Sequence, residues 1–260
     1  MSQTHRDPVL FLHGQPGGAR DWDRVVAAIG PRATTVAIDR PGWRPGSAPT
    51  DLAGNAAAAL EALDDAGAQR ATVVGHSLGG AVAAWLAAEH PDRVHRLVLA
   101  APAANCAALV PLDYWLAWPL AGELVGAPVM AGAGLVLAAS GVRRRVADLL
   151  EVEEPYLAAT ARGLRTPAAW RAFAADQRML VRDLPALEAR LTRIAVPTTI
   201  VAGGADRIVP VSSARSLQAA IPGAELVVLA GAGHLLTQRQ AGELAEIILA
   251  TTNGAAGAGD

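Results

Sequence analysis

A serine lies between two glycines in the segment Gly75-His76-Ser77-Leu78-Gly79. The apolar run Ala71 to Val74 precedes this segment and an alanine-rich stretch follows it, so we expect a sharp turn from a strand into a helix. Such a turn exposes the serine hydroxyl above a sheet, and the glycines let backbone segments approach closely. A glycine-rich turn with an incidental serine would have the same local pattern. The strand before it and the helix after it favour Ser77 as a nucleophile.

A serine hydroxyl is a weak nucleophile near neutral pH unless a base takes its proton. Of the six histidines, His234 follows the last predicted strand in the loop Gly231-Ala232-Gly233. A loop of this kind can carry an imidazole ring over the edge of a sheet. The alternative role for His234 is a cap of the final helix. We predict that His234 is the general base.

Asp206 comes a few small residues after the apolar run Thr198 to Ala202. We therefore expect it at the carboxyl end of a strand, the edge at which open parallel sheets bind ligands. A helix cap, a turn or an ion pair with Arg207 would be the structural alternatives. The chain order Ser77, Asp206, His234 instead favours an aspartate that orients the histidine.

Nucleophilic attack on a carbonyl group creates negative charge on its oxygen, and two backbone N–H groups should face that charge. The N–H group of Leu78, directly after the serine, is the first candidate. The second should come from the turn His13-Gly14-Gln15-Pro16-Gly17-Gly18, which follows the first apolar run. We expect Gln15 to donate there, since Pro16 has no N–H group.

Strand and helix patterns alternate through both ends of the chain, and the strands are apolar on both faces. This pattern predicts an α/β fold with a mostly parallel sheet of about six strands and helices on both faces. The expected strands are Val9–Leu12, Thr34–Ile38, Ala71–Val74, Val94–Leu99, Thr198–Ala202 and Glu225–Leu229. The expected helices are Asp21–Ile29, Asp51–Ala66, Ala81–His90, Ser212–Ala220 and Leu236–Ala250.

The alternation stops between residues 102 and 193, which carry helical patterns but no convincing strand. We interpret 102–193 as an inserted helical cap, and 1–101 together with 194–260 as the core. Trp115, Trp118 and Trp170 are candidates to bind substrate in a hydrophobic cavity, although aromatic residues at helical spacing usually belong to a core. The basic run at 143–145 is more typical of a solvated helix face than of a carboxylate-binding site.

Composition limits the partners of this chain. The 260 residues are 52% apolar with a net charge of −2, which favours a globular protein and gives no basic surplus for nucleic acid. The single cysteine, Cys106, excludes disulfides within the chain and a metal site built on cysteines. We expect a small-molecule substrate, no metal and no nucleic acid. The choice between monomer and homodimer stays open.

The terminal segments and one apolar stretch bear on localisation. The first eight residues lack the pattern of a signal peptide, so we expect a cytoplasmic protein. The small, glycine-rich residues 251–260 predict a disordered tail. Leu124 to Val142 has no charged residue, but Pro128 and several glycines interrupt it. Buried or pocket-lining helices are therefore expected there, a membrane-touching lid is the alternative, and stable insertion into a membrane is not expected.

Taken together, the motifs resemble the α/β-hydrolase superfamily, and in particular its small bacterial members with a cap. The resemblance covers residues 8–101 and about 194–250. The residues that carry it are His13-Gly14-Gln15-Pro16-Gly17, Trp22, Asp39-Arg40-Pro41-Gly42, the turn at Ser77, Asp206 and Gly233-His234. Epoxide hydrolases and haloalkane dehalogenases share the first loop but use an aspartate nucleophile, so Ser77 argues against both.

The resemblance implies a serine hydrolase that cleaves an ester, a lactone or another activated carbonyl bond through an acyl-enzyme, without a cofactor. We expect small or medium, mainly apolar substrates. Two other functions stay open: an acyltransferase or cofactor-free perhydrolase with the same triad, and a non-catalytic binding module on the same fold.

Two features depart from the family pattern. The family usually has two strands before the one that ends in His13-Gly14, and only a short segment precedes Val9 here. A six-stranded sheet would then leave Thr34–Ile38 at an edge that needs covering. Arg44 stands where the family more often has glycine, which would alter the pocket entrance.

Overall fold

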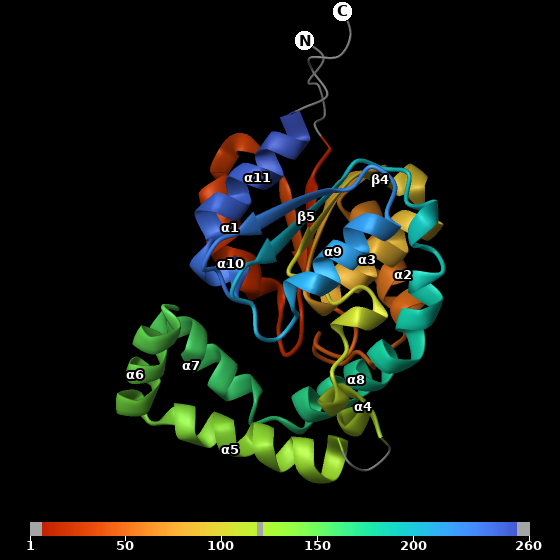
Figure 1. Ribbon diagram of the computed structural model, residues 1–260. Helices are drawn as coiled ribbons and strands as arrows, with labels where there is room; N and C mark the ends of the chain where they lie inside the picture. Colours follow the sequence, from red (N-terminus) through yellow and green to blue (C-terminus); the bar gives the residue numbers. More distant parts are fainter. Residues whose placement is uncertain (1–6, 119–121, 254–260) are drawn as a thin grey trace, which may run out of the picture.

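The computed structural model describes residues 7–118 and 122–253. Its strands form one parallel sheet in the order β2-β1-β3-β4-β5-β6 (Figure 1). The strands are β1 Val9–Leu12, β2 Thr35–Ile38, β3 Ala71–His76, β4 Val94–Ala100, β5 Thr198–Gly203 and β6 Glu225–Leu229. The predicted α/β fold and its six-stranded parallel sheet are confirmed, with β2 at one edge as expected.

Helices cover both faces of the sheet because successive side chains of each strand point to opposite sides. Leu10 and Leu12 of β1 belong to a core shared with α2, α3 and α9. Val9 and Phe11 of the same strand pack on the other face, against α1 and α11. The helices of these two layers are α1 Asp23–Ile29, α2 Leu52–Asp65, α3 Leu78–Glu89, α9 Val211–Ala220, α10 Leu236–Arg239 and α11 Ala241–Asn253.

Several helix bounds differ from the sequence prediction. The helix expected from Asp21 starts as a 3₁₀ turn, and α3 starts at Leu78 directly after the serine. The expected final helix is divided at Gln240 into α10 and α11. α11 continues to Asn253, and the rest of the predicted tail lies outside the described residues. The shorter turns are η1 Ala19–Trp22, η2 Gly30–Arg32, η3 Pro91–Arg93, η4 Cys106–Ala108, η5 Gly122–Gly126 and η6 Leu191–Arg193.

Five longer helices lie between β4 and β5 and extend beyond the carboxyl end of the sheet (Figure 1). They are α4 Pro111–Ala117, α5 Ala127–Ala138, α6 Ser140–Leu150, α7 Glu154–Gly163 and α8 Pro167–Glu188. We call residues 102–193 the helical insertion. The second half of α8 is part of the main core, since Leu180, Leu184 and Leu187 pack in the same cluster as α2 and α3.

The expectation that Leu124–Val142 is buried is wrong for most of this segment. Leu124, Val129 and Leu135 are each more than 60% exposed, while Met130 and Gly134 of α5 are buried. α7 is the main contact of α5 among the described helices. Because the helix is apolar all round, its sequence carries no period that would indicate which side is covered.

No single helix in the described ranges is both long and apolar enough to cross a membrane. The segment Leu124–Ala138 and the helix Ser140–Leu150 pass that test only as a pair, with a bend of 101° between them.

The first prediction concerns the N-terminal cap of α2. The carboxylate of Asp51 accepts a hydrogen bond from the N–H group of Gly54 at 2.7 Å. Asp51→Ala should lower the free energy of unfolding by about 1 kcal/mol because that N–H group loses its partner. Urea denaturation measures the change. Asp65→Ala, at the opposite end of α2, is the matched control and should not destabilise the protein, since an acidic side chain there opposes the helix dipole.

Candidate active site

The predicted site residues follow four strands of the sheet and gather at its carboxyl edge. Ser77 directly follows β3 and the loop His13–Gly18, here called the first loop, follows β1. Asp206 and His234 follow β5 and β6. β1 lies between β2 and β3 in the sheet. The chain therefore passes from β1 to the edge strand β2, and then crosses back to β3 and continues toward the other edge. The loops after β1 and β3 therefore diverge to opposite faces and leave a crevice between them.

Ser77 has a backbone conformation that few residues other than glycine adopt, with φ 53° and ψ −121°. Such strain persists only where the surrounding structure holds it. The N–H group of Ser77 donates to the carbonyl of Ala100 at 3.0 Å. Its own carbonyl accepts from Gly80 at 2.9 Å and from Ala103 at 3.0 Å. These three bonds fix the turn that presents the hydroxyl.

The turn is packed too tightly for side chains at its glycines. A Cβ atom on Gly75 would lie 2.2 Å from the carbonyl oxygen of Gly79. One on Gly79 would lie 2.1 Å from the carbonyl oxygen of Leu12, at the end of β1. The glycines around Ser77 thus allow α3 to start against β1, as the sequence pattern predicts.

Asp206 and His234 are in direct contact. Nδ1 of His234 lies 2.8 Å from Oδ2 of Asp206, while Oδ1 of Asp206 accepts from the N–H groups of Ile208 and Val209. The side chain of His234 is 10% exposed and that of Asp206 is 1% exposed. Burial by itself raises the pKa of Asp206, but the hydrogen bonds from His234 and from the backbone outweigh it and lower the pKa. Asp206 therefore stays ionised beside the imidazole.

The side chain of His76 contacts the backbone of His234. No sequence signal indicated this contact. Its Nε2 atom lies 2.9 Å from the backbone carbonyl of His234, and the two rings are 4.9 Å apart. A carbonyl oxygen only accepts, so Nε2 of His76 carries the proton. Burial lowers the pKa of His76 to about 3, which keeps the ring neutral. The side chain of His76 was expected to point away from the site, and that expectation is wrong, because it contacts the loop that carries His234.

Among the described residues, the Ser77 hydroxyl has no hydrogen bond, to His234 or to any other group. Contacts of this kind are often long in enzymes without substrate. The first loop lies against the serine, because a Cβ atom on Gly14 would be 2.9 Å from Cβ of Ser77. Within the described part of the chain, the N–H groups of Gln15 and Leu78 also donate to no protein group. Leu78 is the first residue of α3, where N–H groups lack a helical partner.

A cavity of about 480 Å³ lies between the first loop and the helical insertion. Residues 16–18 and 42–47 form its core side, and α7 with the start of α8 forms the opposite side. Neither Ser77 nor His234 is among the residues that line it, while Pro16, Gly17 and Gly18 of the first loop are. Arg44 does line it, which agrees with an effect of that residue on the pocket entrance.

The three tryptophans proposed to bind substrate are not among the residues that line this cavity. Trp115 and Trp118 are 42% and 67% exposed at α4. Trp170 is half-buried in α8, and its indole N–H group donates to the carbonyl of Leu164 at 2.6 Å. Leu164 lines the cavity, so Trp170 supports the cavity wall from behind. A binding role for the tryptophans stays a prediction.

Comparisons with known proteins identify the family of this chain. Residues 9–247 match the model of the alpha/beta hydrolase family. The chain belongs to the α/β-hydrolase family. A pimeloyl-[acyl-carrier protein] methyl ester esterase from Neisseria meningitidis is 29% identical over 239 residues, which cover 87% of this hydrolase and 86% of that protein.

Two solved structures extend the likeness to the fold. A hydrolase from Pseudomonas aeruginosa PA01 superposes with a TM-score of 0.71 at 27% identity, covering 98% of this chain and 92% of that one. The enol-lactonase from Burkholderia xenovorans LB400 has a TM-score of 0.74 at 22% identity, covering 95% and 92%. At that identity the lactonase shows the fold alone.

Asp21 of this hydrolase is a further acidic residue at the cavity, and sequence reasoning did not single it out. Its side chain is largely buried beside the first loop, where it accepts a hydrogen bond from the N–H group of Gly18 at 3.1 Å. Burial raises the pKa of Asp21 to about 7. The Tyr156 hydroxyl in α7 contacts Asp21, and burial raises the pKa of that phenol as well. Only the tertiary structure reveals this setting.

The second prediction concerns the pH dependence caused by Asp21. Its pKa is raised in the folded protein, so its contribution to stability is complete below the unfolded value of 3.8 and is lost as the pH rises to about 7. Asp21→Asn removes this loss. The free energy of unfolding of the variant relative to wild type should therefore increase from pH 5 to pH 7, by up to about 1.4 kcal/mol per pH unit.

Urea denaturation at several pH values measures that difference. The pH-dependent contribution of His76 to the free energy of unfolding is the same in both proteins, so it cancels in the difference. Asp65→Asn, at an exposed position at the end of α2, is the control for the loss of a carboxylate that does not act on Asp21, and it should not reproduce this profile. A relative stability of Asp21→Asn that stays constant from pH 5 to pH 8 would contradict the assignment.

Proposed function

We propose that this hydrolase cleaves carboxylic ester bonds, including lactones, in small or medium and mainly apolar molecules, through an acyl-enzyme on Ser77. The observation that carries the proposal is the 2.8 Å contact between Asp206 and His234 at the sheet edge where Ser77 is held in its strained turn. An aspartate with a lowered pKa, bonded to a histidine at the sheet edge that also carries a serine, is the arrangement that activates a hydroxyl.

The contacts define the proton positions. The ionised carboxylate of Asp206 can only accept, so Nδ1 of His234 carries the proton and Nε2 has a free electron pair. In acylation, Nε2 takes the proton of the Ser77 hydroxyl while the oxygen attacks the carbonyl carbon. The tetrahedral intermediate collapses, and His234 returns the proton to the leaving alcohol. A water molecule then attacks the acyl-enzyme by the same route and releases the acid.

Negative charge on the carbonyl oxygen requires donors that are already in place. We assign this role to the N–H groups of Gln15 and Leu78, which have no protein acceptor among the described residues and flank Ser77 on the first loop and on α3. Each such donor contributes about 10²–10³ to kcat in well-studied hydrolases.

The substrate class rests on the cavity and on one relative. The cavity has the volume of a small ligand site, and glycine, alanine, proline and tryptophan residues form much of its wall. The curated relative described as a methyl ester esterase supports the ester class. Lactones are included because a cyclic ester passes through the same tetrahedral intermediate.

The third prediction tests the nucleophile with p-nitrophenyl esters of increasing chain length. Ser77→Ala should lower kcat by about 10³–10⁶-fold, because no other group can form the acyl-enzyme. His234→Ala should cost a comparable factor, and Asp206→Asn a smaller one of about 10⁴-fold or less. Ser216→Ala, on the exposed side of α9, is the control and should leave kcat unchanged. Undiminished turnover by Ser77→Ala would exclude this mechanism.

Product analysis with the wild-type enzyme identifies which molecule accepts the acyl group. We expect the free acid as the main product in water, with added alcohol or hydrogen peroxide diverting only a minor part of the acyl groups. A dominant ester or peracid product at low acceptor concentration would instead indicate an acyltransferase or perhydrolase. Absence of turnover and of acylation with every ester would favour a binding module.

A further inference from the structure

The side chain of Arg40 is completely buried and bonds the backbone of the first loop. Its Nε–H group donates to the carbonyl of His13 at 2.9 Å, and an Nη2–H group donates to the carbonyl of Gly14 at 3.1 Å. One planar guanidinium group thus holds two consecutive peptide groups of this loop. A fork of rigid donors fixes orientation better than a single donor.

The imidazole of His13 holds the same loop from a second side. The backbone N–H group of Arg40 lies 2.9 Å from Nε2 of His13, and a backbone N–H group only donates. Nε2 is therefore unprotonated, and Nδ1 carries the hydrogen that it donates to the carbonyl of Gly14 at 2.7 Å. Burial and the charge of Arg40 keep the pKa of His13 well below its usual value, so this neutral form persists.

Gly14 C=O and Gln15 N–H belong to one peptide group. In a planar trans peptide these two bonds point in opposite directions. Two donors, from Arg40 and His13, hold the Gly14 oxygen on the inner side of the loop and thereby direct the Gln15 N–H group outward. Hydrogen bonds to a carbonyl also polarise its peptide group and strengthen the N–H group as a donor.

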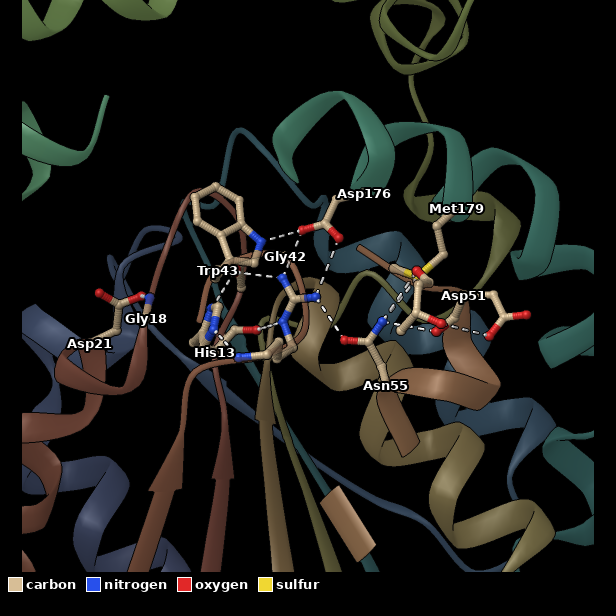
Figure 2. A network of polar contacts seen from close by, with 12 residues as sticks. His13, Gly18, Asp21, Gly42, Trp43, Asp51, Asn55, Asp176 and Met179 are labelled. Carbon is tan, nitrogen blue, oxygen red and sulfur yellow. Dashed lines mark hydrogen bonds and ion pairs between the residues drawn. The ribbon is translucent and has the colours of Figure 1, made fainter. Parts of the chain in front are cut away.

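The charge of Arg40 is balanced by Asp176, which comes from α8 in the helical insertion. Oδ2 of Asp176 lies 2.8 Å from Nη2 of Arg40, and the two side chains are 2% and 1% exposed. The same oxygen accepts from the indole N–H group of Trp43 at 2.8 Å, and Asn55 accepts from Nη1 of Arg40 at 3.2 Å (Figure 2). The carboxylate thus fixes the guanidinium in place.

We propose that Arg40 is a positioning residue of the oxyanion hole, and that Asp176 connects the helical insertion to it. Arg40 and His13 orient and polarise the peptide group whose N–H at Gln15 faces the developing oxyanion. A shift of α8 moves Asp176, Arg40 and this peptide group together. The inference rests on the proposed function, since it assigns a role within that mechanism.

The fourth prediction uses Arg40→Met, Arg40→Lys and Asp176→Asn. Arg40→Met should lower kcat for a p-nitrophenyl ester by about 10²–10³-fold, the factor lost with one oxyanion donor, while KM changes less than about threefold. Arg40→Lys should retain part of the activity because it keeps the charge but not the fork. Asp176→Asn should lie between Arg40→Lys and wild type.

The readout specific to the oxyanion hole is inhibition by a trifluoromethyl ketone, which forms a tetrahedral adduct with the serine. Its affinity should fall in parallel with kcat/KM across the three variants. The affinity for the matching methyl ketone, which stays trigonal, should change less than about threefold. The ¹⁵N and ¹H chemical shifts of the Gln15 backbone amide should differ between wild type and Asp176→Asn.

Two control variants separate positioning from loss of stability. Ser213→Ala removes a fully buried hydroxyl that bonds Asn105 at 2.8 Å, and Arg70→Met removes an exposed ion pair with Asp7. Both should retain wild-type kcat, measured well below the midpoint of thermal unfolding. If Arg40→Met does not fold, kcat and inhibitor affinity are compared for Arg40→Lys and Asp176→Asn alone.

Either of two results would overturn the inference. One is a kcat and a trifluoromethyl ketone affinity within about threefold of wild type in both Arg40→Lys and Asp176→Asn. The other is a loss confined to KM. If Ser77→Ala is inactive in the same assays, such a result removes the role of Arg40 alone, whereas an active Ser77→Ala removes the proposed function itself.

Discussion

The site depends on the reversal of chain winding between β1 and β3. Parallel strands need crossover connections, and here the connection after β1 goes to one face of the sheet while the connection after β3 goes to the other. The two loops separate at the carboxyl edge but still touch at their bases, where Gly14 and Gly79 leave no space for side chains. Ser77 on one loop therefore lies against Gly14 of the other, and β5 and β6 place Asp206 and His234 along the same edge.

Buried polar contacts fix the geometry on both sides of Ser77. On one side, His76 holds the backbone of His234, whose ring bonds Asp206. On the other, Arg40 and Asp176 form an ion pair that is almost completely buried. Removing one partner of such a pair typically costs about 3–5 kcal/mol, because the remaining charge stays buried without compensation. This penalty makes alternative positions of the first loop unfavourable.

The helical insertion has two parts with different packing. The second half of α8 belongs to the main core and carries Asp176, so it is rigidly connected to the site. α5 exposes an apolar surface and contacts the rest of the protein mainly through α7. The wall of the cavity formed by α7 and the start of α8 lies between these two parts. In the proposed mechanism the insertion selects the substrate and the core carries the chemistry, and these two segments meet at the first loop.

The sequence alone was sufficient to predict the parallel sheet, its edge strand and the turn at Ser77. These features depend on local signals: apolar runs of strand length, glycines where the backbone must approach closely, and the order of motifs along the chain. The tertiary structure alone established the contacts of His76, Asp21, Arg40 and Asp176, and it corrected the burial of Leu124–Val142. Such contacts join residues far apart in the chain, 158 positions between His76 and His234, and depend on which helix faces cover each other. A helix that is apolar all round, or an acidic residue in a loop, has no local pattern that indicates its neighbours, so only packing decided their surroundings.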